Sequence, residues 1–133
     1  MVFEEGRVKA LLAADQYSSA LGIEVDEVSG DRLVVSLDLE ARHTNFYDTG
    51  HGGLVFSLAD CALALASNSD HEKAVAVDAH IAFTAPAKVG DRLRASVSRV
   101  SASSKLATYL VEVTRDDGVV CASFTGTVYI ATA

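Results

Sequence analysis

The sequence contains few of the residues from which several kinds of site are built. Its two cysteines, Cys61 and Cys121, stand in apolar segments and form no C-x-x-C or Cys/His pattern. We therefore expect two buried free thiols in a reducing compartment and no metal centre. Lysine and arginine number 11 against 18 acidic residues, and the formal net charge is −7. This balance argues against nucleic acid and against an anionic membrane surface as partners.

Several sequence signals are also missing. There is no glycine-rich phosphate loop, no dinucleotide fingerprint and no G-x-S-x-G nucleophile motif. No linker, internal repeat or low-complexity segment interrupts the chain. The first residues lack the pattern of a secretory signal, and no apolar run reaches the roughly 20 residues needed to span a bilayer. We expect a cytoplasmic protein with one domain over residues 1–133, because half of the 133 residues are hydrophobic and one core is typical of this length.

The most apolar stretch of the chain covers residues 54–66, in which nearly every residue favours a helix. It follows His51, Gly52 and Gly53, and we predict a helix over about residues 52–68. A helix that is hydrophobic all round is buried on all sides. Within it stands one charged residue, Asp60, whose carboxylate would be costly to bury unless it is paired or used. The pattern therefore predicts a central helix that carries one acid, which is either paired or functional.

The remaining segments are predicted to surround this helix. A peripheral helix is expected over about residues 2–20. Alternating or apolar β-type patterns predict strands at about residues 22–28, 32–39, 73–84, 91–100, 106–114 and 119–130. Turn signals at 29–31 and 117–118 separate neighbouring strands. This order favours an α+β fold in which an antiparallel sheet curls around the central helix.

The spacing of Gly52 and Asp60 bears on the chemistry. Free N–H groups at the start of the helix form an electropositive site, and adjacent glycines allow a ligand to approach the backbone. Eight residues of helix separate Gly52 from Asp60 by about 12 Å, too far to act on one carbonyl. In a two-fold dimer with antiparallel helices, Gly52 of one chain could meet Asp60 of the other. The alternative is that Asp60 has only a structural role, as a cap or as a hydrogen-bond partner of a neighbouring strand.

Nearby polar residues admit similar alternatives. His51 could contact a substrate or brace the loop, and Asn45 could orient a carbonyl or a water or simply satisfy a turn. His43, Asp48 and His51 could be imagined as metal ligands, but nothing in their spacing fixes such a geometry. Cys61 follows Asp60 on the helix and so points about 100° away from it, which favours a core position over a nucleophile.

A set of motifs then resembles a known family, the hotdog-fold acyl-CoA thioesterases of the phenylacetic-acid-degradation type. The matching positions run from Asn45 through His51-Gly52-Gly53 and Ser57-Leu58-Ala59-Asp60 to Asn68-Ser69. Later matches are Phe83-Thr84-Ala85-Pro86, Gly90-Asp91, Thr108-Tyr109 and Phe124-Thr125-Gly126. The resemblance covers about residues 21–130.

The resemblance implies a role for each matching residue. Asp60 would be the catalytic carboxylate, either as nucleophile or as general base. Gly52 would donate its N–H to the oxyanion, with Gly53 beside it, and His51 and Asn45 would assist the thioester carbonyl or the water. Ala64 stands where relatives can carry a hydroxyl that positions water, which leaves both roles of Asp60 open.

The resemblance also implies a substrate and an assembly. The reaction would be hydrolysis of an aryl- or medium-chain acyl-CoA to free acid and CoA, with no cofactor. The acyl pocket would use Phe56, Leu63 and Phe83, and Lys105 would meet the CoA phosphates. Lys88, Arg92 and Arg94 are further candidates for the phosphates. The site would lie between the subunits of a homodimer whose sheets join edge to edge, and two dimers would form a homotetramer.

Two other functions remain open at this point. One is a hotdog hydratase or dehydratase, which pairs a histidine with an acid in local motifs that this sequence lacks. The other is a module that binds acyl-CoA without turnover, which would not need the complete set of Asn45, His51, Gly52 and Asp60.

Overall fold

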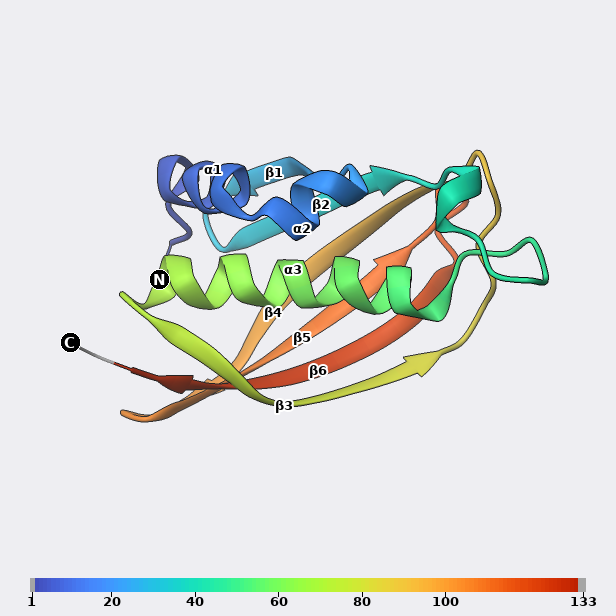
Figure 1. Ribbon diagram of the computed structural model, residues 1–133. Coiled ribbons are helices and arrows are strands. Elements are labelled where there is room, and N and C mark those ends of the chain that lie inside the picture. The colour runs from blue at the N-terminus through green and yellow to red at the C-terminus, as the bar shows by residue number, and fades with distance from the viewer. Residues whose placement is uncertain (1, 132–133) are drawn as a thin grey trace.

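The computed structural model describes residues 2–131. The helical elements are α1 (Glu5–Ala14), α2 (Gln16–Leu21), a short 3-10 turn η1 (Ala41–His43) and α3 (Gly52–Asp70). The strands are β1 (Glu24–Ser29), β2 (Arg32–Asp38), β3 (Ala74–Phe83), β4 (Arg92–Ala102), β5 (Leu106–Thr114) and β6 (Val120–Ile130). These strands form one sheet in the order β1-β2-β4-β5-β6-β3, with antiparallel neighbours throughout. The sheet curves around α3, as predicted, while α1 and α2 lie beside its β1 end (Figure 1).

The N-terminal helix predicted over about residues 2–20 is in fact two helices. Asp15 has an extended backbone, with φ −86° and ψ 97°, and its side chain caps α2 by accepting a hydrogen bond from the Ser18 N–H. The chain therefore changes direction at Asp15 because a carboxylate satisfies the first turn of the next helix. Gly22, at φ 90°, ends α2 in the left-handed region that glycine tolerates.

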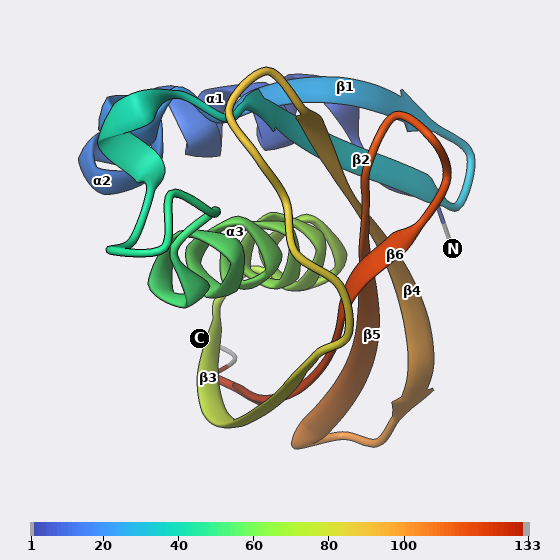
Figure 2. The same ribbon diagram turned by 90° about the vertical axis from the view of Figure 1, so that its right-hand side faces the viewer.

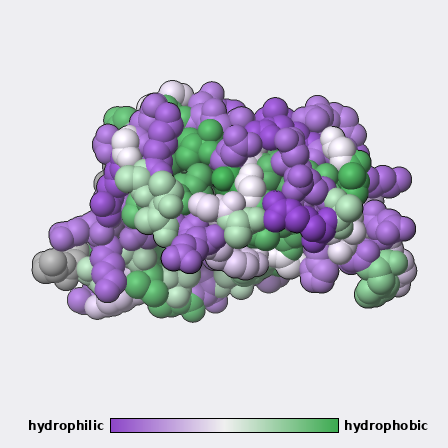
Figure 3. Space-filling view, turned by 45° about the horizontal axis from the view of Figure 1, so that its top comes forward, coloured by the Kyte–Doolittle hydropathy of each residue, from purple (hydrophilic) through white to green (hydrophobic). Residues whose placement is uncertain are grey.

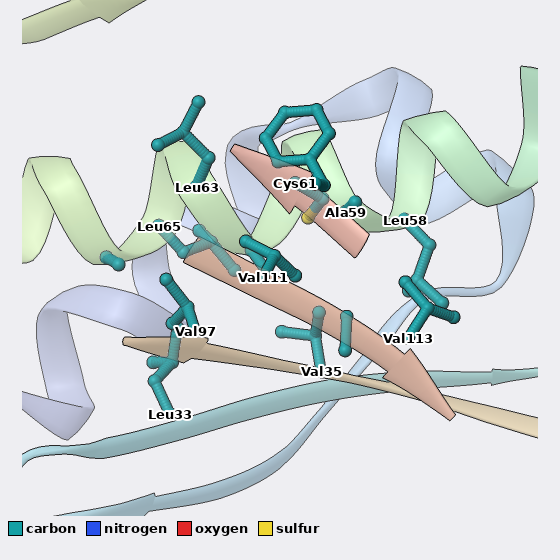
Figure 4. Close-up of a cluster of buried hydrophobic side chains, with 14 of the residues drawn as sticks. Leu33, Val35, Leu58, Ala59, Cys61, Leu63, Leu65, Val97, Val111 and Val113 are labelled. Carbon is teal, nitrogen blue, oxygen red and sulfur yellow. The ribbon is translucent and has the colours of Figure 1, made fainter. Parts of the chain in front are cut away.

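The core lies between α3 and the concave face of the sheet. Every second residue of β5 is buried, as the alternation in the sequence predicts. Leu58 and Leu63 of α3 are almost fully buried and face the strands. Figure 4 draws this cluster, whose labelled members come from α3, β2, β4 and β5: Leu33, Val35, Leu58, Ala59, Cys61, Leu63, Leu65, Val97, Val111 and Val113.

One side of α3 is open, contrary to the prediction of a helix buried on all sides. Gly53 and Ala64 are exposed, and Ser57, Asp60 and Asn68 are only half-buried. Their spacing of three and four residues places them on one stripe of the helix. The sheet covers one side of α3 and α1 with α2 covers another, so a single chain leaves this stripe uncovered.

By length and composition alone, α3 could cross a membrane. The helix has 19 residues and is therefore longer than the apolar run of 13 residues, 54–66, on which the sequence-based prediction rested. A helix in a protein core passes the same test. Ten of its residues are buried within this chain, and this packing accounts for its apolar character.

The strand β3 forms an edge of the sheet, because it pairs only with β6. Most of its residues are exposed, including Val75, Val77 and Phe83. The space-filling view also shows hydrophobic patches set among hydrophilic side chains on the helical side of the molecule (Figure 3). A long edge strand that has apolar side chains and whose outer side is unpaired is a template for pairing with another chain.

A buried ion pair fixes the C-terminal end of α3. The Asp70 side chain, 1% exposed, accepts two hydrogen bonds from the Arg99 guanidinium and one of 2.7 Å from the Tyr109 hydroxyl. Arg99 also lies 3.8 Å above the ring of Phe3. These contacts tie the C-terminal end of α3 to β4, β5 and the N-terminal segment.

Candidate active site

The first turn of α3 leaves one backbone donor free. The N–H groups of Leu54 and Val55 donate to the His51 carbonyl. The Gly53 N–H donates to Nδ1 of the His51 ring at 2.8 Å, so the histidine side chain caps its own helix. Within residues 2–131, the N–H of Gly52 meets no acceptor. Of the four donors that a helix start leaves unsatisfied, only that of Gly52 can polarise a ligand carbonyl.

Both glycines of this turn stand in close contact with a neighbouring ring. A Cβ on Gly52 would lie 3.3 Å from Cζ of Phe83, and a Cβ on Gly53 would lie 3.1 Å from Nδ1 of His51. A side chain at Gly52 would press on the Phe83 ring, and one at Gly53 would crowd the histidine cap. Gly53 therefore serves the cap, and its N–H is not a second free donor.

Asn45 holds the loop before α3. Its Oδ1 accepts from the N–H groups of Tyr47 and Thr49 and from the Thr49 hydroxyl. Three donors converge on this atom, which identifies it as the oxygen of the amide. The Nδ2 group has no acceptor in the described part of the chain. Asn45 therefore satisfies a turn, which is one of the two alternatives considered in the sequence, and its amide N–H groups stay without an acceptor among the residues described.

Asp60 lies half-buried on the open stripe of α3. No hydrogen bond or ion pair joins its carboxylate to another residue between 2 and 131. Burial, with a contribution from the negative charge of Asp15, raises the pKa of Asp60 above its ordinary value of 3.8. A structural role in binding a neighbouring strand finds no support here, because the carboxylate binds no strand. An unpaired carboxylate with a raised pKa is a suitable general base.

A cavity of about 370 Å³ lies beside Gly52 and is called the first cavity below. Its lining joins the loop before α3, the first turn of α3 and the segment after β3: Asn45, Gly50, Gly52, Val55, Phe83, Thr84, Ala85, Pro86, Ala87 and Cys121. Asn45, Gly52 and Phe83, which were all predicted from the sequence, are thus brought together. The segment 84–87 was not predicted as part of the site, since its lining role depends on where β3 ends against α3.

A second cavity of about 270 Å³ lies on the other side of the same turn. It is lined by Tyr17, Leu21, Arg42, His43, Thr44, His51, Gly53 and Leu54, and it shares no residue with the first cavity. Figure 2 shows the arrangement nearly along α3, with α2 on one side of the helix start and the segment after β3 on the other. Nothing in the sequence pointed to Tyr17.

The other residues predicted for the acyl pocket lie in different surroundings. Phe56 is half-buried and packs edge-on against Phe124, with ring centroids 5.3 Å apart. Leu63 is 1% exposed and packs against Gly126, where an added Cβ would come within 2.6 Å of Leu63 Cδ2. Leu63 is thus a core residue in this chain and lines neither cavity.

The basic residues predicted for CoA are scattered. Lys105 follows β4 next to the start of β3 and lies over Tyr129, whereas Gly52 lies near the end of β3. Ten residues of strand separate the two ends by about 30 Å, so Lys105 cannot reach the Gly52 site of its own chain. Arg92 and Arg94 are already paired with acids. Lys88, just after the lining of the first cavity, is exposed and forms no ion pair with the residues described.

The structure also explains the histidine and cysteine residues that were considered as metal ligands or as a nucleophile. His43 is buried, accepts from the Glu40 N–H at Nδ1 and donates through Nε2 to the Leu21 carbonyl, so both ring nitrogens are used. No group of three potential ligands for a metal ion occurs among residues 2–131. Cys61 and Cys121 are free and buried, as predicted, and burial raises the pKa of the Cys61 thiol to about 11. A thiol held in that state is a poor nucleophile.

Comparison with known proteins agrees with this geometry. Residues 47–122 match the model of the thioesterase superfamily. The acyl-coenzyme A thioesterase PaaI of Escherichia coli is 32% identical over 117 residues, which cover 88% of this chain and 84% of that protein. The solved structure of E. coli PaaI, from the phenylacetic acid degradation operon, superposes with a TM-score of 0.91 over 96% of this chain and 93% of that one, at 30% identity.

A second structure extends the comparison. A protein from Thermus thermophilus superposes with a TM-score of 0.82 at 39% identity, over 87% of this chain and 97% of that one. The region matched by the family model contains the first turn of α3, Asp60 and the segment after β3. The chain therefore belongs to the thioesterase superfamily, as a hotdog-fold thioester hydrolase similar to PaaI.

Proposed function

We propose that the protein hydrolyses acyl-CoA thioesters with an aryl or medium-length acyl group. The observation that carries the proposal is the pairing of one free backbone N–H, at Gly52, with one unpaired carboxylate of raised pKa, at Asp60. An oxyanion donor and a base are the two groups that thioester hydrolysis requires. Similarity to the acyl-CoA thioesterase PaaI supports CoA as the leaving group.

In this proposal the two groups come from different subunits. Gly52 and Asp60 of one chain are about 12 Å apart along α3, whereas antiparallel packing of two α3 helices along their open stripes brings each Asp60 near the other Gly52. The unpaired edge of β3 supports such a dimer, since two copies can join their sheets there. The homotetramer remains a prediction, as does a cytoplasmic location, which two free thiols favour.

The proposed reaction begins with the substrate carbonyl at the start of α3. Its oxygen accepts hydrogen bonds from the Gly52 N–H and from Nδ2 of Asn45. Asp60 of the partner subunit takes a proton from water as the water oxygen adds to the carbonyl carbon. The tetrahedral intermediate then expels the CoA thiolate as the C–S bond breaks, and the proton held by Asp60 passes to the sulfur. His51 keeps the turn in shape through its cap to Gly53.

The raised pKa of Asp60 suits a general base, and direct attack by the same carboxylate is the alternative route. Direct attack would form a mixed anhydride between the acyl group and Asp60. Rapid quenching followed by intact mass measurement distinguishes the routes: the general-base route gives unmodified protein, and a protein heavier by one acyl group would instead indicate direct attack.

The proposal is tested by thiol release from a panel of CoA esters: phenylacetyl, hydroxyphenylacetyl, benzoyl, hexanoyl and palmitoyl. Wild type should release CoA from at least one aryl or medium-chain ester, and Asp60→Asn should lose at least about 100-fold in kcat, the usual contribution of a general base. Crotonyl-CoA is included to test for a hydratase. Hydration without CoA release, or CoA binding without any turnover, would replace the thioesterase by one of the two alternative functions.

A further inference from the structure

Tyr17, which lines the second cavity, is held in place by two successive hydrogen bonds. The Ser57 hydroxyl donates to the Gly53 carbonyl at 2.8 Å, and Tyr17 Oη lies 3.0 Å from Ser57 Oγ. A serine hydroxyl has a single proton, so Tyr17 must be the donor in the second bond. These two bonds fasten the ring of Tyr17, which is 65% exposed, to the open stripe of α3. An exposed aromatic ring held in place beside a cavity is suited to contact a ligand.

Part of the wall of the second cavity is apolar, another part is formed by the buried ring of His43, and the cavity is small overall. Leu54 is buried, Leu21 is half-buried, and the Tyr17 ring completes the apolar wall. Its volume of about 270 Å³ is below the range of pockets that hold drug-sized ligands, roughly 300–1,000 Å³. The space suits one aromatic ring or a short chain and is too small for a long fatty acyl chain.

The charges around the two cavities differ. Arg42, on the rim of the second cavity, is already bound to the Glu40 carboxylate and to the carbonyls of Ala20 and Leu21. Asp15 and Asp60 lie on the same side of α3, and their charges would repel phosphate groups. Beside the first cavity, by contrast, stand the exposed amine of Lys88 and the guanidinium of Arg115, which donates to the Pro86 carbonyl, together with the Asp91 carboxylate, which accepts from the Lys88 N–H. The phosphorylated part of CoA is therefore better placed at the first cavity.

We propose that the second cavity receives the acyl group of the thioester and that Tyr17 is the residue that selects it. The inference rests on the proposed function, which places the thioester carbonyl at Gly52. From that point the two arms of the substrate leave in opposite directions, the CoA arm into the first cavity and the acyl group past Gly53 toward Tyr17. Substrate choice is then set by α2, the helix that carries Tyr17.

The test compares kcat/KM for phenylacetyl-CoA and decanoyl-CoA in wild type, Tyr17→Ala, Tyr17→Phe and Ser57→Ala. Removing the ring lengthens the cavity, so Tyr17→Ala should raise the ratio of decanoyl to phenylacetyl activity at least about tenfold, the discrimination that a small change in an apolar pocket supplies. Tyr17→Phe and Ser57→Ala break the same hydrogen bond from either end and keep the ring. Both variants should change the ratio of decanoyl to phenylacetyl activity in the same direction as Tyr17→Ala, but by a smaller factor.

Tyr47→Ala is the matched control, because Tyr47 is also an exposed tyrosine but lines neither cavity. It should leave the ratio unchanged. An equal loss of activity on both substrates in Tyr17→Ala would overturn the proposal, since it would indicate only a structural support for α3. So would a change of the ratio in Tyr47→Ala as large as that in Tyr17→Ala.

A binding measurement separates this inference from the proposed function. The probe is a phenylacetyl-CoA analogue with CH₂ in place of sulfur, titrated calorimetrically beside free CoA. Even if wild type hydrolyses no ester, Tyr17→Ala should bind the analogue at least about fivefold more weakly and bind CoA equally well, because the ring supplies part of the apolar contact area. Unchanged affinity for the analogue would reject the acyl cavity while leaving hydrolysis at Gly52 and Asp60 intact.

Discussion

The backbone N–H of Gly52 can be removed with little other change to the helix. Gly52 is the first residue of α3, where proline is well tolerated, and His51 has φ −62° and ψ 135°, a conformation compatible with a following proline. Gly52→Pro should lower kcat by about 100-fold or more, as loss of one oxyanion donor does. Gly52→Ala, which crowds Phe83 similarly but keeps the N–H, is the control and should lose much less. Equal losses would assign the effect to crowding.

In the proposed mechanism, the charge of Asp60 sets the pH at which the enzyme becomes active. Burial and Asp15 raise the pKa of Asp60, so the acid limb of kcat/KM should have its midpoint above pH 3.8. Asp15→Asn keeps an oxygen to cap α2 but removes the negative charge. It should lower the pKa of Asp60 and shift the acid limb to lower pH, whereas Asp31→Asn in an exposed turn should not. If the acid limb of kcat/KM has the same midpoint in Asp15→Asn as in wild type, the charge of Asp15 does not act on the pKa of Asp60.

The raised pKa of Asp60 also affects the stability of the fold. Because the pKa of Asp60 is higher in the folded chain than in the unfolded one, the folded state loses stability relative to the unfolded state as pH rises through that raised value. Asp60→Asn should therefore have an unchanged or higher Tm at pH 7 despite its loss of activity. A thermal melt of both proteins at that pH checks this, and a clearly lower Tm in the variant would contradict it.

At the scale of the elements, α3 depends on the ion pair at its C-terminal end. Arg99→Met would leave the carboxylate of Asp70, which is 1% exposed, without its cationic partner. Breaking a buried ion pair in this way costs about 3–5 kcal/mol, so Arg99→Met should lower the free energy of unfolding by that amount in urea denaturation. Arg32→Met, which breaks an exposed pair with Glu27, is the control and should cost about 1 kcal/mol or less.

The double variant Asp70→Asn with Arg99→Met completes this comparison. It removes both charges, so it should be more stable than Arg99→Met alone. A double variant no more stable than the single one would show that packing of the Arg99 side chain, rather than its charge, holds the end of α3.

At the scale of the whole molecule, the proposed site requires two chains. Light scattering should give a mass at least twice that of one chain. Chains carrying Gly52→Pro and chains carrying Asp60→Asn, each inactive alone, should regain activity when they are co-expressed. Random pairing makes half of the dimers hybrid, and each hybrid has one intact site, so about a quarter of wild-type activity is expected for a shared site. Purified hybrids with no activity would place both groups within one chain.

The sequence by itself determined the elements and the family. Local spacing was sufficient for this: β5 runs from Leu106 to Thr114 as the alternation predicts, and the apolar run after Gly53 forms α3. The motifs around His51 and Asp60 identified the hotdog thioesterase type. These features are encoded by neighbours along the chain, because strand alternation, helix periodicity and caps involve residues a few positions apart.

Only the tertiary structure decided which of these groups are free to act. The cap by His51 occupies Gly53 and leaves Gly52 as the donor, and the turn around Asn45 occupies its oxygen and leaves its amide nitrogen. Leu63 lies in the core and Lys105 at the far end of β3, although both were predicted for the site. Tyr17 reaches Ser57 across 40 positions of sequence. Contacts between distant segments depend on how α2, α3 and the sheet pack together, and no local pattern specifies that packing.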